Sequence, residues 1–216
     1  MSGSNQRRGR SLAGLLLGSA ILLGSCQFPG GGEPSNLFTL TPKNTFSEGL
    51  PSVDWQLIVE PPIAAAGLST SRIALQRSPV TLEYYANANW TDVAPLMIQT
   101  LLIESFENTG KIVGVSREST TLRADYLLKT ELREFQAEYD GSGPPLARVR
   151  INAKLVRMSD RAIIASHTVE KSARASGGDM PSIAVAFDEA LGHVMRRIVE
   201  WTLTAPPTRS PPRRAS

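Results

Sequence analysis

The chain has 216 residues, 41% hydrophobic and 20% charged, a length and composition that fit one ordinary domain and exclude both a disordered chain and a multispan membrane protein. A single cysteine excludes a disulfide framework and a multi-cysteine metal site. The formal net charge of +3 comes from the two ends of the chain, because residues 26–205 carry 17 basic and 20 acidic side chains. The charge distribution therefore does not favour nucleic-acid binding.

The first 25 residues have the pattern of a secretory signal peptide. Residues 1–11 are polar and contain three arginines, and residues 12–23 form an apolar run of 12 residues. A helix that crosses a bilayer needs roughly 20 apolar residues, so this run is too short to span one. A basic segment followed by a short apolar run is typical of a signal peptide.

The residues after the apolar run, Leu23-Gly24-Ser25-Cys26, resemble a bacterial lipobox. The resemblance implies cleavage after Ser25 and lipid attachment at Cys26. An ordinary signal peptide cut elsewhere, or a short buried helix with a core cysteine, is the alternative. By resemblance to lipoproteins of enteric bacteria, Gln27 in place of Asp favours the outer over the inner membrane. We therefore expect a lipid anchor at the periplasmic face of the outer membrane.

Composition divides the rest of the chain. Residues 26–36 hold the lipidated cysteine and a Gly- and Pro-rich stretch that predicts a flexible tether. Residues 204–216 contain four prolines and three arginines, which predicts a disordered tail. The folded domain is expected over residues 37–203.

Short strands are predicted over residues 37–40, 55–60 and 80–85, where β-branched and aromatic residues concentrate. Residues 63–78 do not follow one period, and residues 72–75 fit either a strand or a turn of helix.

A helix is predicted between Asp92 and Asn108, because apolar residues recur there at every third or fourth position. Asp92 is expected as its N-cap, which places Pro95 at the third helical position, where a missing N–H is not needed. Gly110 is expected to end the helix, and residues 112–115 to form the next strand.

Three further strands are predicted over residues 125–139, 147–157 and 163–173. In the first of them the alternation of apolar residues changes phase near Arg133 and Glu134, which indicates a bulge. The last helix is expected after the turn at residues 177–179, with a continuous apolar stripe formed by Ile183, Phe187, Ala190, Leu191, Val194, Ile198 and Trp201.

Short turns between alternating strands favour antiparallel neighbours. The predicted order of elements is three strands, a helix, four strands and a helix. We therefore expect an α/β fold of α+β type, in which a mixed, largely antiparallel sheet is covered by two long amphipathic helices.

The motifs in their order resemble the ABC-type transport auxiliary lipoprotein family (PqiC-like). Besides the lipobox, the matching segments are Phe38-Thr39-Leu40-Thr41-Pro42, Leu57-Ile58-Val59-Glu60-Pro61-Pro62, Arg72-Ile73, Leu82-Glu83-Tyr84-Tyr85-Ala86, Asn89-Trp90, Pro95-Leu96 and Asp125-Tyr126-Leu127-Leu128. The resemblance covers residues 37–203 and implies a fold similar to the N-terminal domain of TolB or to anticodon-binding-like domains. It also implies an accessory role in an ABC transport system with an MCE-domain partner, which moves phospholipids or other hydrophobic molecules between the inner and outer membranes.

No catalytic constellation is predicted. The chain lacks a phosphate-binding Gly-rich loop, so ATP hydrolysis would belong to another subunit. His167 and His193 have no ligand motif around them and are expected in structural roles. Glu131 and Glu134 would point to opposite faces of a regular strand. We accordingly predict no enzyme activity, no metal site and no cofactor.

The candidate partner-binding residues are Trp90, Tyr84, Tyr85 and Arg72, because aromatic and arginine side chains are enriched at interface hot spots. The alternative for Trp90 is that it packs as a lid on the core. A stand-alone structural envelope lipoprotein, bound to the cell wall through the Pro/Arg tail, is the alternative function. Self-association is left open.

A basic row is expected on one face of the predicted strand over residues 147–157. Arg148, Arg150 and Lys154 alternate there with apolar residues. Such a row is usually a solvated face, and an acidic partner or lipid headgroups are the alternative occupants.

Overall fold

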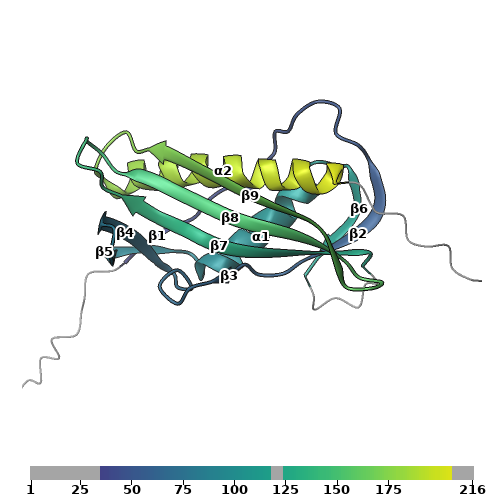
Figure 1. Ribbon diagram of the computed structural model, residues 1–216. Coiled ribbons are helices and arrows are strands. Elements are labelled where there is room, and N and C mark those ends of the chain that lie inside the picture. Colours follow the sequence, from purple (N-terminus) through teal and green to yellow (C-terminus); the bar gives the residue numbers. More distant parts are fainter. Residues whose placement is uncertain (1–34, 118–123, 206–216) are drawn as a thin grey trace, which may run out of the picture. The chain divides into compact units, whose positions relative to one another are not determined.

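The computed structural model describes residues 35–117 and 124–205. Helices and strands follow one another as β1 (Asn36–Phe38), β2 (Val53–Val59), β3 (Ile63–Ala64), β4 (Arg72–Ser78), β5 (Thr81–Trp90), α1 (Ala94–Glu107), β6 (Ile112–Ser116), β7 (Tyr126–Glu138), β8 (Leu146–Arg157), β9 (Ala162–Arg174) and α2 (Met180–Thr204). The strands join in one sheet, and both helices pack against the same face of it (Figure 1). The domain is thus a two-layer α+β sandwich with two amphipathic helices, as the sequence predicts.

The long strand β7 organises the sheet. One side of β7 pairs with β8 along its whole length, and the other side pairs in turn with β2, β3 and β4. The β7–β8, β8–β9 and β4–β5 ladders are antiparallel and hold most of the paired residues. The prediction of a mixed, largely antiparallel sheet is therefore confirmed.

Five pairings between described strands are parallel, and the sequence did not reveal them. Each involves at least one of the short strands β1, β2, β3, β4 and β6, which have seven residues or fewer. Strands of this length show too few alternations for a period to be read, and a parallel neighbour needs no short turn that would mark it.

The early part of the chain contains more strand than expected. The ambiguous residues 63–78 contain β3 and β4, and β5 continues from Thr81 to Trp90 instead of ending near Tyr85. Asn87 adopts a positive φ of 53° in the irregular part of the β4–β5 ladder, which lets the strand continue after a change of register. Beyond that point Trp90 pairs with Phe38 of β1.

The start of α1 corrects one prediction. Asp92 is not the N-cap: the helix begins at Ala94, and its N-cap Val93 has no side-chain capping bond. The Asp92 carboxylate instead accepts the Val93 N–H at 2.7 Å. The Ala94 N–H donates to the Thr70 carbonyl at 3.1 Å, and Pro95 has no N–H to satisfy, so the loop before β4 replaces a side-chain cap.

The start of α2 follows the usual chemistry of a helix N-terminus. Asp179 is its N-cap and accepts the Ser182 N–H at 2.9 Å, which lowers the pKa of the Asp179 carboxyl. The apolar stripe predicted for this helix is buried, with Phe187, Leu191 and Val194 fully inside the core. Trp201 is half-buried at the end of the stripe.

The predicted bulge in β7 is confirmed, because the β7–β8 register shifts between Leu132 and Glu134. On the helix side of the bulge, Leu132 and Phe135 both enter the core. On the opposite side the strands present polar side chains, and we call this side the outer face of the sheet.

Candidate functional site

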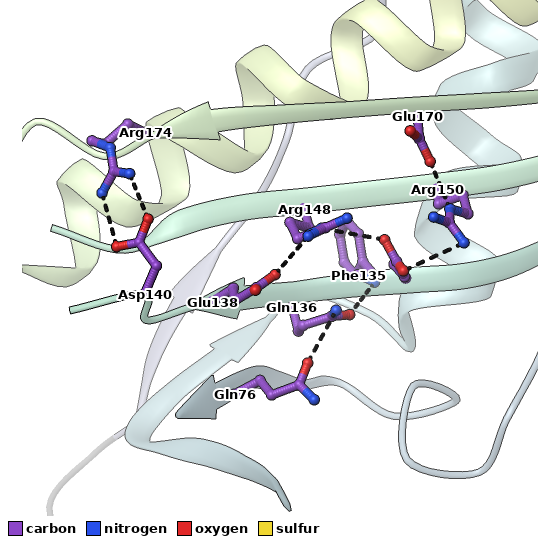
Figure 2. A network of polar contacts seen from close by, with 10 residues as sticks. Gln76, Phe135, Gln136, Glu138, Asp140, Arg148, Arg150, Glu170 and Arg174 are labelled. Carbon is purple, nitrogen blue, oxygen red and sulfur yellow. Dashed lines mark hydrogen bonds and ion pairs between the residues drawn. The ribbon is translucent and has the colours of Figure 1, made fainter. Parts of the chain in front are cut away.

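The outer face of the sheet carries a network of ion pairs on its long strands. Arg148 of β8 contacts Glu134 at 3.4 Å and Glu138 at 3.0 Å (Figure 2). Arg150, the next outward residue of β8, contacts Glu134 at 3.6 Å and Glu170 of β9 at 2.8 Å. One carboxylate, Glu134, therefore joins two arginines, and the network links three neighbouring strands.

This network neutralises two of the three cations in the basic row predicted on β8. Burial by itself would lower the pKa of Arg148, but the hydrogen bond to Glu138 and the charge of Glu134 raise it. Both Arg148 and Arg150 already have acidic partners within the chain, so this part of the outer face is close to neutral. Lys154, farther along β8, is exposed and has no carboxylate within 4.0 Å among the described residues.

The bulge in β7 also overturns the expectation for Glu131 and Glu134. A regular strand would place them on opposite faces, but the extra residue at Arg133 returns both to the outer face, opposite Asn152 and Arg150. Glu131 forms an ion pair with Arg133 at 2.9 Å, whereas Glu134 forms ion pairs with Arg148 and Arg150. The two carboxylates thus belong to separate ion pairs.

Arg72 and Tyr84 form a stacked pair. The guanidinium carbon of Arg72 lies 3.8 Å from the centre of the Tyr84 ring, and the Tyr84 hydroxyl donates to the Gly67 carbonyl at 3.0 Å. A β-carbon at Gly67 would lie 2.8 Å from a methyl carbon of Leu82, so a larger residue at this position would require the Leu82 side chain to move. Arg72 is exposed and has no carboxylate within ion-pair distance in the described part of the chain.

Tyr85 points the other way from Tyr84 and joins β5 to the end of β7. Its hydroxyl lies 3.0 Å from the hydroxyl of Tyr139. Burial, together with this hydrogen bond, raises the pKa of Tyr85 far above its ordinary value, so the phenol stays protonated. Arg77 lies over the Tyr139 ring, with its guanidinium carbon 5.3 Å from the ring centre.

Trp90 lies in the core. Its side chain is 1% exposed and packs against Phe135 and Phe187, with ring centres 5.4 and 5.2 Å away. Its indole N–H has no hydrogen-bond partner among the described residues. The geometry matches the packing alternative for Trp90, whereas Arg72 and Tyr84 lie where another molecule can reach them.

The two histidines lie in different environments. His167 stacks on Trp201, with ring centres 5.6 Å apart. His193 of α2 has a lowered pKa because it is partly buried and lies near the charges of Lys171, Arg196 and Arg197. No group of three His, Cys, Asp or Glu side chains comes together within residues 35–117 and 124–205 in a way that could hold a metal ion.

A polar groove that the sequence did not indicate lies beside His193. Its volume is about 720 Å³, and it is lined by residues 41–44, the end of α1, the middle of α2 and Lys171 of β9. Lys43, Lys171 and Arg196 all face it. These residues are separated by up to 153 positions, so no local motif could have brought them together.

Cys26, Ser25, the rest of the predicted signal peptide, most of the predicted tether and the predicted tail from residue 206 onward lie outside the described residues. Both α1 and α2 fall short of the combination of length and apolar character that crossing a bilayer would require.

A family model for the ABC-type transport auxiliary lipoprotein component matches residues 37–199. The chain belongs to this family. A crystal structure of a protein from Xanthomonas campestris has 34% sequence identity and a TM-score of 0.75, and the match covers 79% of this chain and 96% of that one. The family resemblance found in the sequence is therefore confirmed.

Two further similarities add detail. An uncharacterized protein of Bradyrhizobium diazoefficiens is 29% identical over 189 residues, which are 86% of this chain and 50% of the relative, so the chain spans about half the length of the curated relative it matches. A crystal structure of another uncharacterized protein has 14% identity and a TM-score of 0.63 over 79% of this chain and 99% of that one. This second structure is similar in fold alone.

Proposed function

We propose that the chain is a non-enzymatic, lipid-anchored periplasmic accessory component of an ABC transport system that contains an MCE-domain protein. The system would move phospholipids or other hydrophobic molecules between the inner and outer membranes. The observation that carries this proposal is the family match over residues 37–199. Other subunits would hydrolyse ATP, and this chain would contribute a binding surface.

The anchor belongs to the same proposal. Residues 1–25 would be the signal peptide, residues 26–36 the lipidated cysteine and tether, residues 37–203 the auxiliary domain and residues 204–216 the tail. Each buried CH₂ of an acyl chain contributes ~0.8 kcal/mol, so two or more chains on Cys26 would hold the protein stably at the membrane. Gln27 supports the outer membrane as the location.

The anchor has a direct test, because Cys26 is the one cysteine of the sequence. Cys26→Ser should abolish incorporation of labelled palmitate and leave the signal peptide uncleaved by the lipoprotein-specific peptidase. Gln27→Ala is the matched control and should be labelled as wild type. Equal labelling of wild type and Cys26→Ser would exclude the assignment.

The surface proposed to meet the MCE-domain partner is the Arg72–Tyr84 pair. Stacking over the ring holds the Arg72 guanidinium in place, so less side-chain entropy is lost when a partner binds it. Its donors have no acidic partner among the described residues and remain open to carboxylates or carbonyl oxygens of another chain. Tyr85 and Trp90 would support this surface without contacting the partner. Tyr85 fixes β5 to Tyr139, and Trp90 fills the core.

Photocrosslinking in intact cells tests this surface. A photoreactive amino acid at position 72 should yield an adduct with the MCE-domain protein. The same group at exposed Ser159 should yield no adduct. Ser159 lies in the turn between β8 and β9, beside the start of β7. Adducts from position 159 alone, or from neither position while the transport complex is intact, would contradict the proposed surface.

A further inference from the structure

The groove beside His193 is held open by contacts between distant segments. Asp188 of α2 accepts the Thr41 N–H at 2.7 Å and the Thr41 hydroxyl at 3.0 Å. The Lys43 N–H donates to the Ser105 hydroxyl at 2.9 Å, and the side-chain amide of Asn108 donates to the Lys43 carbonyl at 3.1 Å. Residues 41–44 are thereby fixed against both helices and form one wall of the groove.

The cations of the groove come from three separate elements. Lys43 extends from this wall, and its stem runs over Gly192, where an added β-carbon would lie 3.9 Å from Lys43 Cδ. Lys171 projects from β9, and Arg196 from α2. Both Lys171 and Arg196 line the groove beside His193, and their positive charges contribute to the lowered pKa of that residue.

The groove is lined by three cations and by the carboxylates of Asp188 and Glu189, and its cations are paired less closely than the arginines of the outer face of the sheet. In the described chain, no carboxylate lies within 4.0 Å of Lys43 or Lys171, and Arg196 reaches Glu200 only at 4.0 Å. Asp188 keeps its negative charge but is turned toward Thr41, from which it accepts two donors, and Glu189 is exposed at the groove. Lys43 and Lys171 thus have no acidic partner among the described residues, and Arg196 shares the carboxylate of Glu200 with Arg197.

We propose that this groove binds a phosphate-bearing anion, with Lys43, Lys171 and Arg196 as its charged ligands. Arginine recognises the oxygens of a phosphate through paired N–H donors, and lysines contribute point charges around it. A volume of about 720 Å³ exceeds what a single ion fills and suits a small phosphorylated molecule or a lipid headgroup. This site goes beyond the transport role proposed above and does not depend on it.

Calorimetric titration of the whole protein, as purified from cells in a non-ionic detergent, tests the proposal. The probes are inorganic phosphate, glycerol 3-phosphate, and dihexanoyl phosphatidylglycerol below its micellar concentration. Saturable binding of at least one probe is expected. Lys171→Gln and Arg196→Gln should each weaken it roughly tenfold, since hydrogen bonds to charged groups carry energies of that order.

Lys154→Gln is the matched control, because it removes one exposed positive charge from the outer face of β8. It should leave the affinity unchanged, and the unfolding temperature of each variant without a probe shows that it is folded. Tighter binding of the short-chain lipid than of glycerol 3-phosphate would identify a headgroup as the source of the anion, and the reverse a soluble metabolite. Absence of saturable binding by all three probes, or equal weakening by Lys154→Gln, would overturn the proposal.

Discussion

Substitution of Trp90 separates a core role from a binding role, because its ring is buried and its N–H has no hydrogen-bond partner among the described residues. Trp90→Ala removes a side chain that is 1% exposed and packs on two phenylalanines, and such truncations destabilise proteins by about 3–5 kcal/mol. Release of the buried N–H, which has no partner among the described residues, offsets part of this loss. We therefore expect a loss near the lower end, about 3 kcal/mol.

Trp90→Phe should behave differently from Trp90→Ala. The smaller ring buries fewer carbon atoms. At about 0.8 kcal/mol per carbon group, the hydrophobic stabilisation falls by roughly 2 kcal/mol. Removal of the unpaired N–H restores about 1–3 kcal/mol, because a buried donor without an acceptor is unfavourable by that amount. The two effects nearly cancel, and we expect Trp90→Phe to lie within about 1 kcal/mol of wild type.

Urea unfolding followed by far-ultraviolet circular dichroism measures both variants without relying on the fluorescence of the replaced residue. Phe187→Ala is the control, since it empties the same cluster with no N–H to release, and it should cost about 3–5 kcal/mol. The reasoning fails if Trp90→Phe is as destabilising as Trp90→Ala, or if Trp90→Ala costs less than about 1 kcal/mol.

Three further outcomes follow from the contacts. Glu134→Gln weakens the pairs with Arg148 and Arg150 and should cost no more than about 1 kcal/mol, with the loss shrinking at high salt in urea titrations; an undiminished loss would contradict this. Thr41→Val removes the hydroxyl bond to Asp188 but keeps the N–H bond, so the free energy of unfolding should fall by about 1 kcal/mol, and an unchanged value would show that the bond is not formed. The pKa of His193 is lowered from 6.5 in the folded state, so the unfolded chain binds more protons than the folded chain as the pH falls through that value. Wild type should therefore lose more stability than His193→Gln between about pH 7.5 and pH 5. Unfolding temperatures that fall in parallel for the two proteins would refute the assignment.

The elements with long, regular periods could be predicted from the sequence. The apolar stripe of α2 and the phase change at Arg133 both correspond to observed structure, because each extends over enough residues for its period to be read. The N-terminus of α1 could not be predicted, because its first N–H is satisfied by Thr70 from a distant loop instead of by Asp92. The residues near the start of a helix do not indicate a hydrogen-bond partner that is distant in sequence.

The candidate sites show the same limit. Arg72 and Tyr84 could be singled out by residue type, but their stacking depends on the β4–β5 register. The groove could not be predicted, because Lys43, Lys171 and Arg196 lie in three separate segments of the chain. These segments meet only after α2 has packed against the sheet. Identification of such a site from sequence requires the tertiary contacts themselves.

Copurification from native membranes is the measurement that tests the central claim most directly. The tagged full-length chain, extracted in a mild detergent, should recover an MCE-domain protein together with the ATPase and permease of one ABC transport system, and Arg72→Ala should recover less of all three. Lys154→Gln, which removes a positive charge elsewhere on the outer face of the sheet, should recover the same amounts as wild type. Recovery of peptidoglycan-associated proteins without any MCE-domain or ABC subunit, from membranes in which that transport complex is shown to be intact, would contradict the accessory role and favour a structural envelope lipoprotein.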